Sequence, residues 1–188
     1  SVVWCFPVAF TAQRIFPAMV NNIFRYEVDL LTVSLDGADA QTNNSIRCGA
    51  DFDTILKDVS RIVAKKRELG VEYPYISFVM TMMESNFRSF PDYVRLAKKM
   101  GIQEVKGVYL TVFDDAMEAE SLNGKADELR EVYQQAQALG DELEIAVNCP
   151  TSRERISQGK RPTRSALWDG ETFSWVLMAL CVAACPRR

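Results

Sequence analysis

The chain has 188 residues and a formal net charge of −3, and hydrophobic residues make up 48% of it. This length is enough for one domain with a sizeable core, and the charge gives no general case for binding nucleic acid or an anionic membrane. The sequence contains no histidine, which excludes histidine bases, histidine-containing triads and histidine metal sites.

The cysteines and the apolar segments bear on the location of the protein. Five cysteines at scattered spacing argue against a disulfide framework and favour a reducing, cytoplasmic setting. The N-terminus has no basic residues ahead of its apolar part, so it does not predict a signal peptide. The uncharged run 173–185 is short for a membrane span, which needs about 20 residues. We therefore expect no membrane partner.

Residues 1–22 show no clear period, and a regular alternation follows them. The apolar run Val28–Leu35 ends in Asp-Gly and predicts a buried strand. A helix is expected next, because apolar residues recur at spacings of about three and four. Asp51 or Asp53 is its candidate N-cap, and Gly70 is the expected left-handed residue at its end.

The alternation then repeats along the chain. Further strands and helices are predicted, in order, at Tyr73–Met83 (strand), 89–101 (helix), Gln103–Phe113 (strand), Lys125–Gly140 (helix) and Leu143–Asn148 (strand). Apolar strands that alternate with helices indicate an α/β fold with a parallel sheet. Four such units cannot close an eight-unit barrel, so we expect an open sheet or a partial, incomplete TIM-like (β/α) barrel.

Ligands of parallel α/β folds bind at the carboxyl ends of the strands. The residues expected at this edge are mostly hydroxyls, amides and carboxylates: Ser34, Asp36, Gly37, Met83, Glu84, Ser85, Asn86, Leu110, Thr111, Asp114, Asp115, Asn148 and Cys149. They suit hydrogen bonds to a ribose or an amino acid better than a phosphate clamp. An Asp-Gly pair is also a common turn, so the alternative for each residue is a structural role.

The segment Leu30–Gly70 resembles part of the radical S-adenosylmethionine (radical SAM) enzymes. Family members show a strand that ends in Ser-hydrophobic-Asp-Gly, then a polar segment, then R-x-G-x-x-F at the start of a helix. Here the matching residues are "SLDG" (34–37), Arg47, Gly49 and Phe52. Residues 74–110 are similar to the next two units of the family.

The resemblance covers about Val28–Asn148 and is greatest to the branch with a C-terminal SPASM or twitch extension, whose members often modify peptides. It implies that Ser34 and Asp36 meet the ribose and the methionine part of S-adenosylmethionine. It also implies that Arg47 meets the carboxylate of this cofactor and that Leu110 packs against adenine. The alternatives are a solvated Arg47 and a core Leu110.

One departure from the family concerns its iron–sulfur cluster. The CxxxCxxC motif that holds the family's [4Fe–4S] cluster is absent from the sequence. Cys181 and Cys185 have the first spacing of that motif and lack a third cysteine, and Cys149 precedes a proline, as at the approach to an auxiliary cluster. We therefore expect a core fragment that is inactive alone, from a partial gene or a shifted reading frame.

The expected organisation is an irregular segment 1–22, a partial barrel 23–150, and a linker with an anomalous tail 151–188. In the intact enzyme the resemblance implies reductive cleavage of S-adenosylmethionine and abstraction of a hydrogen from a small-molecule or peptide substrate. It also implies a reductant such as ferredoxin or flavodoxin. The first alternative is a non-catalytic binding or scaffold module with half a barrel. The second is an unrelated enzyme with Glu84, Asp114 and Asp115 as acid/base groups.

Overall fold

A computed structural model of the chain describes residues 8–10 and 17–149. Its centre is a sheet of five parallel strands that lie in the order of the sequence. The strands are β1 (Val8–Phe10), β2 (Leu30–Ser34), β3 (Tyr75–Met82), β4 (Glu104–Tyr109) and β5 (Ala146–Asn148). Within the described part, β1 and β5 each pair on one side, so the sheet is not closed into a barrel.

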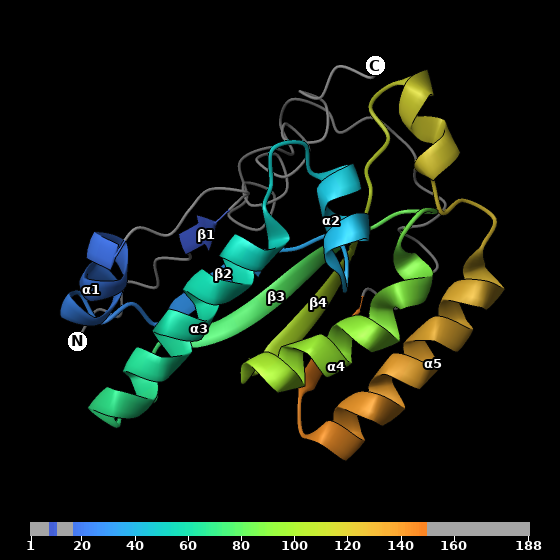
Figure 1. Cartoon of the computed structure of the whole chain (residues 1–188). Coiled ribbons are helices and arrows are strands. Elements are labelled where there is room, and N and C mark those ends of the chain that lie inside the picture. The colour runs from blue at the N-terminus through green and yellow to red at the C-terminus, as the bar shows by residue number, and fades with distance from the viewer. Residues whose placement is uncertain (1–7, 11–16, 150–188) are drawn as a thin grey trace, which may run out of the picture.

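Helices connect each strand to the next. They are α1 (Pro17–Arg25), α2 (Ala40–Ile46), α3 (Phe52–Leu69), α4 (Phe90–Met100) and α5 (Ala126–Leu143), with short 3₁₀ helices η1 (Phe87–Ser89) and η2 (Asp115–Glu120). In Figure 1, α3, α4 and α5 lie side by side in front of the strands. Parallel strands in chain order with helices on one face are the arrangement of a barrel wall. The predicted α/β fold with an incomplete parallel barrel is therefore confirmed.

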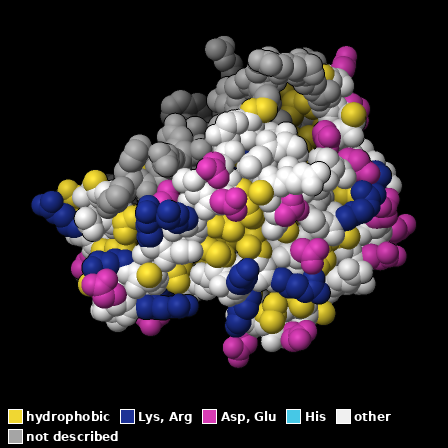
Figure 2. All heavy atoms as spheres, viewed as in Figure 1, with side chains coloured by type: hydrophobic (Ala, Val, Ile, Leu, Met, Phe, Trp, Pro, Cys, Tyr) yellow, Lys and Arg dark blue, Asp and Glu magenta, His cyan; other side chains and the backbone are white. Residues whose placement is uncertain are grey.

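The core lies between the sheet and this helix layer. Its largest fully enclosed side chains are Tyr93, Phe78, Phe87, Phe90, Leu31, Leu35, Ile62, Ile76, Met80, Met82, Leu129 and Val33. Alternate residues of β2 and β3 supply many of them, because successive side chains of a strand point to opposite faces. On the outer surface of the helices, acidic and basic side chains are interspersed (Figure 2).

The helix ends follow the sequence signals closely. The Asp51 side chain accepts a hydrogen bond from the Thr54 N–H at 3.1 Å and so caps α3. Gly70, at φ 63°, and Gly101, at φ 73°, end α3 and α4 in the left-handed conformation that glycine tolerates best. The predicted bounds of this part of the fold are confirmed to within a few residues.

Three predicted bounds are wrong, and one of them is the start of the last strand, since β5 begins at Ala146 rather than at Leu143. Helix α5 does not end at Gly140 but continues to Leu143. Gly140 has a packing role instead, since a Cβ there would lie 2.5 Å from Cγ2 of Val147, where β5 crosses the helix. Strand β4 ends at Tyr109 rather than Phe113, and the polar residues beyond it form η2.

The structure contains elements that the sequence pattern did not indicate. Strand β1 and helix α1 form a strand–helix unit ahead of β2, and α2 lies between β2 and α3. No described helix is both long and apolar enough to cross a membrane. The predicted linker after residue 150, including Cys181 and Cys185, lies outside the described residues.

Candidate functional site

The SLDG segment lies where β2 leaves the sheet, and its aspartate is fully enclosed. The Asp36 side chain is 0% exposed, and its Oδ1 accepts the Thr81 N–H at 2.8 Å. Its Oδ2 lies 2.7 Å from Nε of Arg47, although these two atoms are not aligned as a hydrogen bond. An ion pair this deeply buried needs its partner, because one charge left alone costs several kcal/mol.

The position of Asp36 follows from the parallel ladder. The Leu35 N–H donates to the Val79 carbonyl at 3.0 Å, as the ladder between β2 and β3 requires. One step further along β3, the Thr81 N–H is met by the Asp36 carboxylate instead of a main-chain carbonyl. The side chain thus continues the ladder at the point where β2 turns away.

Two buried asparagines hold the main chain of Asp36. Its N–H donates to Oδ1 of Asn43 at 2.9 Å, and its carbonyl accepts from Nδ2 of Asn86 at 2.9 Å. Asn86 also donates to the Thr81 carbonyl at 2.8 Å and accepts from the Met83 N–H at 2.8 Å. One residue of the loop after β3 therefore joins the ends of β2 and β3.

Glycine at position 37 allows α2 to approach this segment. A Cβ on Gly37 would lie 2.6 Å from the main-chain nitrogen of Asn43 and 2.8 Å from Cβ of Thr42. Asp39 caps α2, since its side chain accepts from the Thr42 N–H at 2.8 Å. This hydrogen bond is the largest cause of the lowered pKa of Asp39. Gly37 of the Asp-Gly pair thus provides the surface against which α2 packs.

Arg47 is the residue after α2, and its side chain points into the protein toward Asp36. Its side chain is 3% exposed, so the alternative of a solvated arginine does not hold. Its Nη1 is buried without a hydrogen-bond partner, and so is Oγ of Ser34, a residue that is 1% exposed. Buried polar groups normally find partners. Unpartnered groups on two predicted site residues therefore mark the carboxyl edge of β2 as a place where a ligand would satisfy them.

Tyr93, on α4, belongs to the same neighbourhood. It is 0% exposed, and its hydroxyl has no hydrogen-bond partner. Burial raises the pKa of Tyr93 well above its ordinary value, with the negative charge of Asp36 adding to the rise and Arg47 opposing it. The hydroxyl therefore stays protonated and is not a base.

Leu110 occupies the carboxyl end of β4, next to the β3 edge. It is half-buried, and its N–H donates to the Met82 carbonyl at 3.2 Å. It is not among the residues that form the hydrophobic core, so the alternative of a core leucine is not favoured. A contact between Leu110 and adenine stays a prediction.

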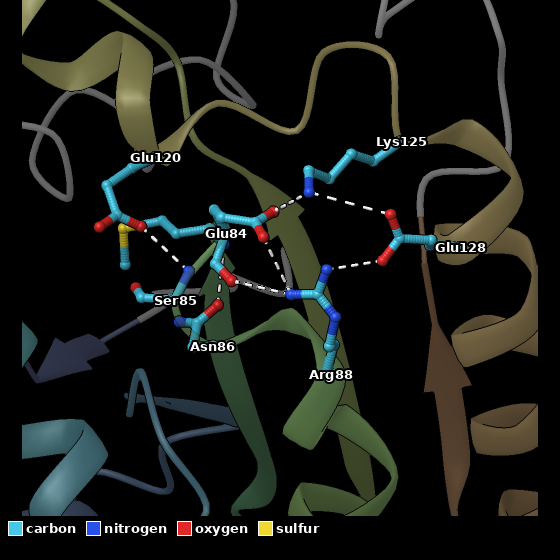
Figure 3. A network of polar contacts seen from close by, with 8 residues as sticks. Glu84, Ser85, Asn86, Arg88, Glu120, Lys125 and Glu128 are labelled. Atoms are coloured by element: carbon cyan, nitrogen blue, oxygen red, sulfur yellow. Dashed lines mark hydrogen bonds and ion pairs between the residues drawn. The ribbon is translucent and has the colours of Figure 1, made fainter.

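A charged network joins the loops after β3 and β4 (Figure 3). Arg88 binds Glu84 at 3.0 Å and Glu128 at 2.6 Å, and Lys125 lies 2.9 Å from the second Glu84 oxygen. The Ser85 N–H also donates to the Glu120 carboxylate at 3.0 Å. These contacts tie the start of α5 to the loop ahead of α4.

The network bears on the acid/base alternative. Its hydrogen bond with Lys125, above all, lowers the pKa of Glu84, which makes a general-acid role at neutral pH unfavourable. The Asp114 carboxylate accepts the Met117 N–H at 3.0 Å and caps η2. Both acids therefore have structural partners, and the geometry does not favour an enzyme built on them.

The described residues contain no group of three or more acidic, cysteine or histidine side chains that would hold a metal ion. Cys149 is a free thiol whose pKa burial raises to about 12, so it is not a ready thiolate ligand. The described part of the chain does not fit an iron–sulfur cluster.

Sequence reasoning named Ser34, Asp36 and Arg47 and placed Asn86 at the same edge, but it missed Asn43 and the hydrogen bonds that Asn86 makes. Asn43 gave no signal, because it lies in a short polar helix that the pattern did not reveal. Asn86 had a usable signal, since asparagine directly after a strand commonly bonds to nearby main chain. Whether any of these residues contacts a ligand stays a prediction.

Comparisons with known proteins bear on the fold of the chain. No protein-family model and no curated protein matches the chain. Among solved structures it is similar to SuiB of Streptococcus suis bound to S-adenosylmethionine, with a TM-score of 0.61 and 13% identity over 84% of this chain and 36% of that chain. SuiB bound to its precursor peptide SuiA gives a TM-score of 0.57 and 12% identity over 78% and 32% of the two chains. The chain thus spans about a third of these neighbours, and what it shares with SuiB, a radical SAM enzyme, is the fold.

Proposed function

We propose that the chain is the core part of a radical SAM enzyme and supplies one side of an S-adenosylmethionine pocket. The observation that carries the proposal is the pair of buried, unpartnered polar groups, Oγ of Ser34 and Nη1 of Arg47, at the carboxyl edge of β2. The fold likeness to a protein solved with S-adenosylmethionine supports the same ligand. A hydroxyl and a guanidinium suit the hydroxyl and carboxylate groups of this cofactor.

The four residues predicted from the sequence to bind the cofactor keep their places in the proposed site. Ser34 bonds a ribose hydroxyl, Arg47 binds the cofactor carboxylate, and Leu110 covers the adenine. Asp36 belongs to the same site at the edge of β2. When bound and reductively cleaved, S-adenosylmethionine supplies the species that abstracts a hydrogen atom from substrate.

The substrate and redox partners of the intact enzyme are also proposals. A peptide substrate and a place in the SPASM branch are supported by the likeness to SuiB, which was solved with a precursor peptide. A reductant such as ferredoxin or flavodoxin and a [4Fe–4S] cluster come from the family resemblance. The described residues do not fit the cluster, so no step of the reaction is assigned to it here. Cytoplasmic location stays a prediction.

Ligand binding by the full 188-residue chain tests the proposal. Calorimetric titration with S-adenosylhomocysteine, a stable analogue, is expected to give saturable binding that Ser34→Ala weakens about tenfold, the effect of losing roughly 1.4 kcal/mol. Ser60→Ala is the matched control, because Ser60 is exposed on α3 and its hydroxyl bonds only within that helix, to the Leu56 carbonyl. Absence of saturable binding, or equal effects of the two variants, contradicts the proposed site.

One observation favours the alternative of a binding or scaffold module. Strand β5 pairs only with β4 among the described strands, and an open parallel edge accepts an added peptide strand. Saturable binding of an extended peptide, with no binding of S-adenosylhomocysteine, would support the module over the enzyme.

A further inference from the structure

We propose that Asp36 is a positioning residue that holds Arg47 and does not itself touch the cofactor. The inference rests on the proposed S-adenosylmethionine site and deepens it. It assigns the two residues different tasks, with the aspartate acting through the arginine.

The polar groups of Asp36 already have neighbours within the protein, unlike Oγ of Ser34 and Nη1 of Arg47. Asp36 is 0% exposed, and its carboxylate is taken up by the Thr81 N–H on one oxygen and by Arg47 on the other. Its N–H and carbonyl are bonded to Asn43 and Asn86. A ribose hydroxyl could reach this carboxylate only by displacing contacts that join β2 to β3.

The Arg47 guanidinium has the opposite character. Its Nε lies in an ion pair 2.7 Å from Oδ2 of Asp36, without the alignment of a hydrogen bond, and its terminal Nη1 is buried and has no hydrogen-bond partner. A guanidinium is planar, so fixing Nε fixes the directions of the terminal N–H groups. The charge of the Asp36 carboxylate therefore holds the guanidinium in place, with Nη1 left for the ligand.

The hydrogen bonds around Asp36 fix its side chain, and with it the position of the Arg47 guanidinium. The Asp36 side chain also completes the ladder to Thr81, so its position is determined by the sheet edge rather than by α2. Asn86 fixes the same edge from the loop after β3. The sheet thus determines where Arg47 points, although Arg47 itself follows α2.

Binding of two ligands distinguishes an Asp36 that positions Arg47 from an Asp36 that contacts the ligand directly. S-adenosylhomocysteine and methylthioadenosine share adenine and ribose, and only the first carries the amino-acid carboxylate. In Asp36→Asn the amide oxygen still accepts the Thr81 N–H, while the charge facing Arg47 is lost. We expect this variant to bind S-adenosylhomocysteine at least tenfold more weakly and methylthioadenosine within twofold of the wild type, with the same pattern for Arg47→Lys.

The matched control is Asp58→Asn. Asp58 is also a buried acid, 2.7 Å from an arginine, Arg61, but it lies on α3. It should leave the affinity for both ligands unchanged. Tenfold weaker binding of methylthioadenosine by Asp36→Asn would overturn the inference, because loss of a ribose contact or of the fold weakens both ligands alike.

A measurement on the wild type covers the case in which Asp36→Asn fails to fold. Hydrogen exchange at the Arg47 Nε–H, followed by NMR without ligand, should be at least a hundredfold slower than at the Nε–H of Arg61, whose side chain is 49% exposed. Equal exchange rates would show that Arg47 is not held and would overturn the inference. If the wild type binds neither ligand, the proposed function fails, while the exchange rates still decide whether the arginine is positioned.

Discussion

Replacing Asn86 with alanine is expected to destabilise the protein by about 3–5 kcal/mol. The Asn86 side chain is buried, with 2% of the residue exposed, and makes hydrogen bonds to the Asp36 carbonyl, the Thr81 carbonyl and the Met83 N–H. A main-chain group left buried without its partner costs about 1–3 kcal/mol, and three groups near the lower end of that range give about 3–5 kcal/mol. The sum is a large part of the roughly 5–15 kcal/mol that stabilises a typical domain.

Urea unfolding followed by circular dichroism measures this loss. With a slope of about 2 kcal/mol per M, the midpoint should fall by about 2 M while the slope stays constant. Asn123→Ala is the control, because Asn123 is exposed, and it should change stability by less than about 0.5 kcal/mol. Asn86→Asp keeps the acceptor for Met83 and loses the donor, so it should also be strongly destabilising. A loss below about 1 kcal/mol for Asn86→Ala would refute the role of this side chain as the link between β2 and β3.

Two further substitutions test the packing and the cap near the site. Gly107→Ala should cost about 1–3 kcal/mol in the same unfolding assay, because its Cβ would lie 2.6 Å from Sδ of Met82; an unchanged midpoint would mean that the Met82 side chain moves aside freely. Asp39→Ala should cost about 1 kcal/mol at pH 7, and Asp53→Ala, in the first turn of α3, should cost less because Asp51 rather than Asp53 caps that helix. Since the folded-state pKa of Asp39 is lowered from 3.8, its stabilisation is present above that value and is lost as the pH falls through the folded-state pKa. The gap between wild type and Asp39→Ala should therefore narrow below about pH 4, and a gap that persists at pH 2 would contradict the cap.

The sequence predicted the central strand–helix units well because local physics determines them. Apolar runs gave β2 and β3, and Asp51, Gly70 and Gly101 marked helix ends through contacts with nearby main chain. The predicted end of α5 was wrong for a non-local reason. Gly140 is a normal helix stop by sequence, yet it lies inside the helix because β5 packs against it.

In the candidate site, too, the sequence predicted some features and could not predict others. The residues Ser34, Asp36 and Arg47 were named from the expected strand edge and the family resemblance, and the structure brings Asp36 and Arg47 into an ion pair. The main chain of Asp36 is held by Asn86, which is 50 residues away from Asp36 in the chain. No periodic pattern carries such a contact, so the sequence named the participants and could not assign their tasks.

The strand order also has a consequence for how the protein is made. Because strands that are consecutive in the sequence are neighbours in the described sheet, each described unit after the first finds its docking surface already present when it leaves the ribosome. Folding can then proceed from the N-terminal side toward the C-terminal side, with short loops to close at each step. Each intermediate on this route exposes the unpaired edge of its last strand. The longer the ribosome takes to deliver the next strand–helix unit, the longer this edge can pair with a wrong strand.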